Sequence, residues 1–186
     1  NEYLLGHVNE NERVFTSANY TFWLNFETDI WQLRGGHWQA SIHPWQRHAE
    51  YQITNGEDGE TSILWLKTFA INWLVVNTHG SDIHYRDYKY PSKFVPFLGE
   101  AEIVAYPTEI VYQIPLKHSL AAPVLLANMI SLSVPQNGAD KQALKQYVAW
   151  LESSDSSLSW QTVHNDHYQI QGVTAEGEGI RVAMSY

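Results

Sequence analysis

Histidine is the residue type in this sequence with the widest range of chemistry, and the chain contains nine of them. Imidazole nitrogens transfer protons near neutral pH and bind zinc or copper. His43 and His48 lie on either side of a segment that contains Pro44, so a loop there can bring the two rings together. The alternative is a solvated pair of residues at the ends of two strands, without metal.

A second pair, His164 and His167, encloses Asn165 and Asp166. In a tight turn, two imidazoles and a carboxylate can converge on one metal ion. The sequence offers no third histidine nearby, and a polar turn between two strands explains the same four residues. Both histidine pairs are therefore metal hypotheses that compete with ordinary turn structure.

The segment His79-Gly80-Ser81-Asp82 contains a hydroxyl, a base and a carboxylate. Catalytic triads are assembled from distant parts of a fold, whereas these residues in direct succession are common in turns. The sequence also lacks a Gly-x-Ser-x-Gly motif, a phosphate-binding glycine loop, a His-Glu-x-x-His motif and a dinucleotide-binding fingerprint. We therefore assign no catalytic residue and no cofactor, and we favour a protein that is not an enzyme.

Aromatic residues are unusually frequent, with 8 Trp, 11 Tyr and 6 Phe. Large rings that lie outside the core suit sugars or protein partners, because they combine a flat apolar face with a polar edge. Three tryptophans fall outside the regular apolar positions, and three tyrosines cluster beside Arg86 and Lys89. The candidate ligand-binding residues are Trp23, Trp45, Trp160, Tyr85, Tyr88 and Tyr90. For the tyrosines, an edge strand with mixed faces is the alternative interpretation.

The net charge of −9 excludes some partners. A negative field repels phosphate, and the few basic residues are mostly solitary, so we expect neither nucleic acid nor an anionic membrane surface as a partner. The absence of cysteine excludes disulfides and thiolate sites. We expect a protein partner, or a small-molecule or glycan ligand.

The start of the sequence bears on the compartment. The chain starts at Asn1, as processed precursors do, and we expect a periplasmic or extracellular location. The longest apolar stretch, residues 120–134, contains Pro123 and is shorter than the roughly 20 residues that span a bilayer. No transmembrane segment is therefore predicted in this chain, although a membrane-anchored parent protein is compatible with it.

Apolar residues that alternate with polar ones predict strands. Two runs on either side of Gly35-Gly36 predict a hairpin, because glycine reaches the positive φ of a tight turn. Strands are predicted over residues 20–26, 30–33, 38–42, 48–54, 63–66, 69–76, 83–90, 102–106, 109–114, 158–163, 168–172 and 180–186.

Two helices are predicted in the second half of the chain. One covers residues 124–132 after Pro123, which can occupy a first helical turn. The other begins at Asp140, which can cap free backbone amides, and places Leu144, Val148 and Leu151 on one face.

These elements predict a single α+β domain over residues 1–186, with residues 1–12 as a flexible N-terminal arm. Its core is a mostly antiparallel sheet of about seven or more strands, with two helices packed on one face. The leading functional hypothesis is a non-enzymatic, extracytoplasmic binding or interaction module, such as a sensory or accessory domain of an envelope protein. The alternatives are a carbohydrate-binding module and a small histidine-dependent hydrolase or metalloenzyme.

Overall fold

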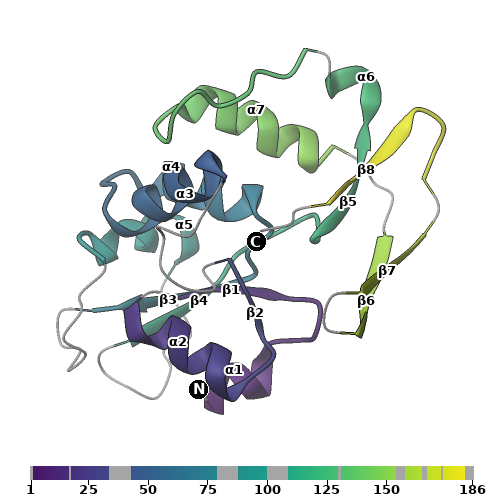
Figure 1. Cartoon of the computed structure of the whole chain (residues 1–186). Helices are drawn as coiled ribbons and strands as arrows, with labels where there is room; N and C mark the ends of the chain where they lie inside the picture. The colour runs from purple at the N-terminus through teal and green to yellow at the C-terminus, as the bar shows by residue number, and fades with distance from the viewer. Residues whose placement is uncertain are drawn as a thin grey trace.

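The computed structural model describes residues 2–16, 18–33, 43–78, 88–99, 109–129, 131–153, 158–164, 167–172 and 174–182. Figure 1 shows a central sheet with helices on both faces and a smaller group of strands beside it. The fold is α+β.

The central sheet has the strand order β2-β1-β3-β4. It consists of β1 (Arg13–Phe15), β2 (Trp31–Gln32), β3 (Trp73–Asn77) and β4 (Glu109–Gln113). β1 is parallel to both β2 and β3, whereas β4 is antiparallel to β3. All five residues of β3 are buried, as expected of a strand that is covered on both faces.

Helices cover the sheet in two layers (Figure 1). One layer contains α1 (Glu2–His7) and α2 (Ala18–Glu27), and the opposite layer contains α3 (Pro44–Thr54), α4 (Gly59–Thr68), a 3-10 helix (Pro91–Phe94) and α5 (Val95–Leu98). Alternate side chains of β3 enter the two layers: Trp73 and Val75 pack with Leu24 of α2, whereas Leu74 and Val76 pack with the α3 and α4 side. The core therefore has two halves, separated by the sheet.

The C-terminal part forms two further antiparallel pairs, β5–β8 and β6–β7. Its elements are β5 (Ala121–Leu125), α6 (Leu126–Met129), α7 (Lys141–Leu151), β6 (Leu158–His164), β7 (His167–Gly172) and β8 (Glu178–Val182). α7 packs against α4 through Leu144, which belongs to the same core cluster as Trp65. Trp31 of β2 and Ile170 of β7 both pack against Leu120, which connects the central sheet to this part.

Local sequence explains where the main helices begin. Asp58 accepts hydrogen bonds from the amides of Glu60 and Thr61 at the start of α4, and Asp140 accepts one from Ala143 at the start of α7. These carboxylates satisfy amides that have no partner within the helix. α3 begins at Pro44, whose fixed φ suits the first helical position.

Several sequence predictions are confirmed. The helix that begins after Asp140 is α7. Strands are present at β4, β6 and β7, and the buried segment 69–76 contains most of β3. In each case a strong local signal agrees with the position that the tertiary structure gives the segment.

The fold is α+β, but the predicted antiparallel sheet with two helices on one face is wrong, because the central sheet is mixed and carries helices on both faces. Residues 20–26, 48–54 and 63–66, predicted as strands, belong to α2, α3 and α4. These segments are short, and their apolar residues fit a period of two nearly as well as a helical period. A parallel sheet needs such crossover helices between its strands, which the local pattern did not reveal.

Two further predictions need correction. The helix predicted over residues 124–132 is replaced by β5, in which Pro123 lies opposite Ile180, and by the short helix α6. Trp31 and Gln32 pair in parallel with Arg13 and Val14, so β2 has a partner distant in sequence. The predicted Gly35-Gly36 turn and residues 38–42 lie outside the described residues.

Candidate functional site

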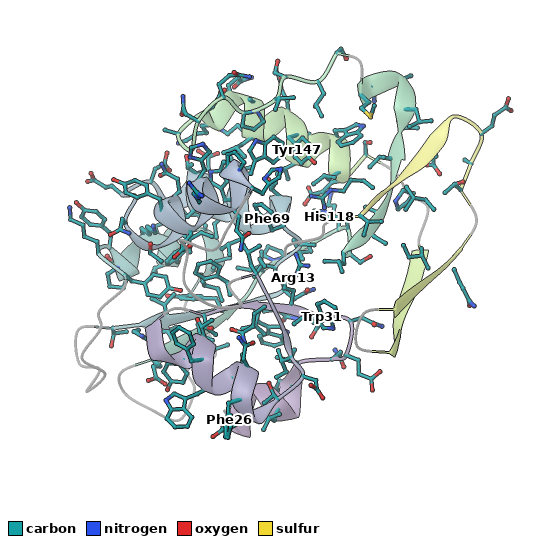
Figure 2. The ribbon with its side chains drawn as sticks, viewed as in Figure 1. Arg13, Phe26, Trp31, Phe69, His118 and Tyr147 are labelled. Atoms are coloured by element: carbon teal, nitrogen blue, oxygen red, sulfur yellow. The ribbon has the colours of Figure 1, made fainter. Side chains whose placement is uncertain are left out.

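The outer side of α2 carries the most exposed aromatic surface in the described part of the chain. Phe22 is 53% exposed, Trp23 57% and Phe26 83%, and we call these three residues the aromatic face. The rings of Trp23 and Phe26 meet edge to face, with 6.4 Å between their centroids. Figure 2 shows Phe26 at the periphery of the molecule, on the far side of α2 from α3 and α4.

Helix geometry separates the aromatic face from the buried side of α2. Residues 22, 23 and 26 fall within about 100° of arc, because successive residues are rotated by about 100°. Thr21 and Leu24 lie on the opposite side and are buried. α2 is therefore apolar on both sides, and a helix of this kind is normally covered on both.

Acidic side chains dominate the exposed charges of the segment that contains α2. Arg13 is the only lysine or arginine among residues 1–33, and it is buried, where its Nη1 donates to the carbonyl of Phe69. Glu10, Glu27 and Asp29 are exposed. This layer of the molecule therefore presents a negative potential beside the aromatic rings.

A second candidate surface is a half-open depression of about 400 Å³ against α3. It is lined by Arg47, Glu50, Tyr51, Thr54 and Asn55. Their spacing of three and four residues places them along one stripe of α3 and its C-cap Asn55, where Tyr51 is exposed and Thr54 is buried. The volume lies within the range of about 300–1,000 Å³ that is typical of small-molecule sites.

The end of α3 is held by a buried lysine. Lys93 is 9% exposed, and its Nζ donates to the carbonyls of Gln52 at 2.6 Å and Gly56 at 2.7 Å. Burial lowers the pKa of Lys93 to about 8, while the charge of Asp58 acts in the opposite direction. The amine stabilises the C-terminus of α3, so we assign it a structural role.

Two basic side chains of the C-terminal part contact the C-terminus of α4. His118 Nε2 donates to the carbonyl of Lys67, and Arg181 Nη2 donates to the carbonyl of Thr68. Burial lowers the pKa of His118, and the charge of Arg181 acts in the same direction. These contacts attach the C-terminal part to α4, and burial outweighs the hydrogen bond to Lys67, which by itself would raise the pKa of His118.

Salt bridges connect the beginnings of α4 and α7. Lys141 bridges Asp58 and Glu60, and Lys145 contacts Glu60 at 2.7 Å. Burial works against ionisation of Asp58, but hydrogen bonds from Lys141 and Thr61 outweigh it and lower the pKa. Because each carboxylate contacts a lysine, this cluster is explained by helix packing.

The structure separates the three predicted tryptophans. Trp23 belongs to the aromatic face. Trp45 is half-buried on α3, where its ring meets those of Trp65 and Tyr147 edge to face. Trp160 is on β6, and the placement of its side chain is not described.

The predicted tyrosines do not form one surface in the described residues. Tyr88 is buried, and its hydroxyl donates to the carbonyl of Val75. Tyr90 is half-buried beneath the ammonium of Lys89. Tyr85 lies outside the described residues.

The predicted histidine pairs have different surroundings. His43 caps α3, where its Nδ1 accepts a hydrogen bond from the amide of Trp45, and His48 lies near the ring of Trp65. His164 and His167 are partners at the end of the β6–β7 pair, but their side chains are not described. Across the described ranges, no group of three or more His, Cys, Asp or Glu side chains could hold a metal ion. Residues 79–82 lie outside those ranges.

Sequence reasoning missed most of both candidate surfaces. The strands predicted over residues 20–26 and 48–54 place Phe22, Phe26 and Tyr51 at alternate apolar positions of a sheet, whereas all three lie on helices. One signal could have indicated a helix with a polar stripe. Pro44 directly follows the capping residue His43, and polar residues then follow at positions 47, 51, 54 and 55.

Comparisons with models of protein families, with curated proteins and with solved structures give no match to this chain. In the described residues, no helix has both the length and the apolar character needed to cross a membrane. Any functional conclusion therefore depends on the surfaces of the molecule itself.

Proposed function

We propose that this domain is a protein-interaction module that binds its partner through the aromatic face of α2. The observation that carries the proposal is the exposure of Phe22, Trp23 and Phe26, each above one half, on a helix whose other side is buried. Together the three side chains expose roughly 400 Å² of surface, since each large ring offers about 150–250 Å². Exposed apolar patches of about 300–600 Å² are often functional.

Charge indicates the chemistry of the partner. Glu27 follows Phe26 directly, Glu10 and Asp29 are also exposed, and no exposed lysine or arginine accompanies them in residues 2–33, leaving out 17. A partner surface with apolar side chains at its centre and lysine or arginine at its rim is complementary to this arrangement. A second copy of the chain would oppose carboxylate to carboxylate, and an anionic membrane would be repelled.

The area of the aromatic face indicates how much of a protein interface it could form. A standard interface buries about 800 Å² on each partner, so the aromatic face would supply about half of one side. Central tryptophans in interfaces are typical hot spots, whose truncation costs about 2 kcal/mol or more. We therefore expect Trp23→Ala to raise the Kd by about 30-fold.

The test uses two synthetic amphipathic helices with the same leucine pattern, one with lysine and one with glutamate on the polar face. Binding is measured by fluorescence anisotropy of the labelled peptide at increasing salt concentration. The lysine peptide should bind, with an affinity that falls as salt rises, whereas the glutamate peptide should not. Trp23→Ala and Phe26→Ser should weaken binding without changing the free energy of unfolding by more than about 0.5 kcal/mol.

Two controls make the outcome specific. Phe97→Ala removes an exposed ring on α5, in the opposite helical layer, and should leave peptide binding unchanged. Leu24→Ala, on the buried side of α2, should instead cost about 2–5 kcal/mol of stability. Equal binding of the two peptides, or full binding by Trp23→Ala, would contradict the proposal. A dimer that Phe26→Ser dissociates in sedimentation equilibrium would identify a second copy as the occupant and also contradict it.

A further inference from the structure

The β5–β8 pair has an open edge along β8 in the described part of the chain. There β8 pairs with β5 alone, and Figure 1 shows both strands at the periphery of the molecule, near α7 and away from α2. An open edge presents backbone donors and acceptors with which another extended chain can pair. We propose that the outer edge of β8 binds an extended segment of a partner protein by β-strand addition. The inference does not depend on the proposed function, because it concerns different residues in a different place.

The pairing of β5 with β8 decides which backbone groups of β8 point outward. In an antiparallel pair, residues that exchange two hydrogen bonds alternate with residues that exchange none. Pro123 lies opposite Ile180 and has no N–H, so these two residues do not exchange two bonds. The amide of Leu126 donates to the carbonyl of Gly177, three positions along the ladder, as this alternation requires. The N–H and C=O groups of Ile180 and Val182 therefore point away from β5.

The two faces of β8 have different surroundings. Arg181 faces α7, where its guanidinium lies 5.9 Å from the centre of the Tyr147 ring, and its Nη2 donates to the carbonyl of Thr68. Because side chains alternate along a strand, Ile180 and Val182 face the other way, and they are 51% and 41% exposed. One face of β8 is therefore anchored to α4 and α7, while the outer edge combines backbone groups with two exposed apolar side chains.

An extended peptide is the ligand that matches these groups. The outward N–H and C=O groups recur at every second residue of β8, and a neighbouring strand offers acceptors and donors at the same spacing. In β-strand addition, main-chain hydrogen bonds supply affinity and alternate side chains supply specificity. Apolar residues at every second position of the peptide would lie beside Ile180 and Val182. We therefore expect the partner segment to alternate apolar with polar residues.

Charge and size favour a partner segment over a second copy of this chain. Glu176 and Glu178 lie at the start of β8, and Arg181, the only basic residue among residues 174–182, faces α7. Lysine or arginine among the polar residues of the segment is complementary to these carboxylates. A second copy would bring together two chains of net charge −9. It would also pair two strands of five residues, far less than the about 800 Å² that each partner buries in a standard interface.

The experiment titrates ¹⁵N-labelled protein with a short peptide, blocked at both ends, in which valine alternates with lysine. Binding should shift the amide resonances of β8 in a saturable manner. It should also slow hydrogen exchange at the amides of Ile180 and Val182, which point outward. The amide of Arg181 points toward β5 and provides an internal control, because its protection should be the same with and without peptide.

Two control peptides separate backbone pairing from other modes of binding. A peptide with the same side chains but N-methylated backbone amides cannot donate to β8, and it should not bind. A peptide with glutamate in place of lysine keeps the donors and should bind more weakly at low salt, because it meets Glu176 and Glu178.

Two variants of β8 test the same contact from the side of the protein. Ile180→Pro removes an outward N–H and leaves the ladder to β5 intact, as Pro123 does in β5, so it should weaken peptide binding by about tenfold. Ile180→Ala keeps the N–H and should weaken binding by a smaller factor. Val134→Ala, which shortens an exposed apolar residue between α6 and α7, should bind as the unchanged protein does. If Ile180→Pro does not fold, the N-methylated peptide and the exchange measurement decide the question.

Other outcomes overturn the inference. If the lysine peptide does not shift the β8 resonances, or if the N-methylated peptide binds equally well, β-strand addition is wrong. If the glutamate peptide binds as tightly as the lysine peptide, the basic partner is wrong. A dimer in sedimentation equilibrium that Ile180→Pro dissociates would identify a second copy as the occupant. Because Trp23→Ala leaves β8 intact and Ile180→Pro leaves α2 intact, this inference and the proposed function can fail independently.

Discussion

Replacement of Lys93 by methionine tests how the two helical segments on either side of Gly56 are held together. The buried amine donates to the carbonyls of Gln52 and Gly56. Methionine has a similar length but cannot donate, so both carbonyls would lose a charged partner. A hydrogen bond to a charged group contributes about 1.5–3 kcal/mol, but removal of the buried charge offsets part of this, so we expect Lys93→Met to lower the free energy of unfolding by about 1–2 kcal/mol at pH 7.

The pH dependence gives a sharper test of the same contact. Burial lowers the pKa of Lys93 from 10.5 to about 8 in the folded protein. Between these two values the unfolded chain keeps a proton that the folded chain has released, so stability rises with pH. One pKa unit corresponds to about 1.36 kcal/mol, and partial contact of the amine with solvent reduces the effect. We expect a gain of about 1–2 kcal/mol between pH 8 and about 9.5.

Urea denaturation at several pH values measures this gain. The unchanged protein should become more stable over that range, whereas Lys93→Met should not. Lys89→Met removes an exposed lysine only four residues away and should keep the slope. The range ends below pH 10 because burial raises the pKa of Tyr112, and its opposite contribution begins at higher pH. Parallel pH curves for the unchanged protein and Lys93→Met would refute the reasoning.

Two further predictions concern packing and a neutral histidine. Gly59→Ala should destabilise the protein by about 2–3 kcal/mol, because the new Cβ would clash with the backbone carbonyl oxygen of Lys93. The matched control is Gly6→Ala in α1, where nothing lies within 4 Å of the new Cβ. This substitution should be neutral or slightly stabilising. Equal changes in the melting temperature of the two variants would contradict the argument. Burial lowers the pKa of His118, so the unfolded chain takes up a proton at this residue more readily than the folded protein as the pH falls below 6.5. The unchanged protein should therefore lose stability over this range, and His118→Gln should remove that loss. Chemical denaturation between about pH 7 and 5 measures the difference, and identical slopes for the two proteins would show that His118 is not the group responsible.

The sequence was most informative where a local signal and the tertiary environment agree. Asp140 followed by apolar residues at helical spacing predicts α7, and the dense apolar run around Leu74 predicts a strand, which the structure buries on both faces. Both signals are strong because capping chemistry and complete burial restrict the backbone without help from distant residues.

The candidate surfaces were less predictable. The irregular position of Trp23 makes it a candidate for an exposed ring, and it is exposed, but the sequence does not predict the helix that groups it with Phe22 and Phe26. Tyr51 was assigned to a strand, so the stripe that it forms with Arg47 and Thr54 was not visible. In both cases the sequence shows the aromatic residues, but it does not show the helical period of 3.6 residues that places them on one surface.

The sequence by itself determined the charge of the molecule, the absence of thiol chemistry and the elements with strong local signals. Only the tertiary structure decided that residues 18–27, 44–54 and 59–68 are helices, because short segments with apolar residues on two sides satisfy either period. The parallel pairing of β1 with β2 and β3 makes these helices necessary as crossovers, since parallel strands cannot be joined by tight turns. That pairing joins residues as far apart in the chain as Val14 and Trp73, and no local pattern records it.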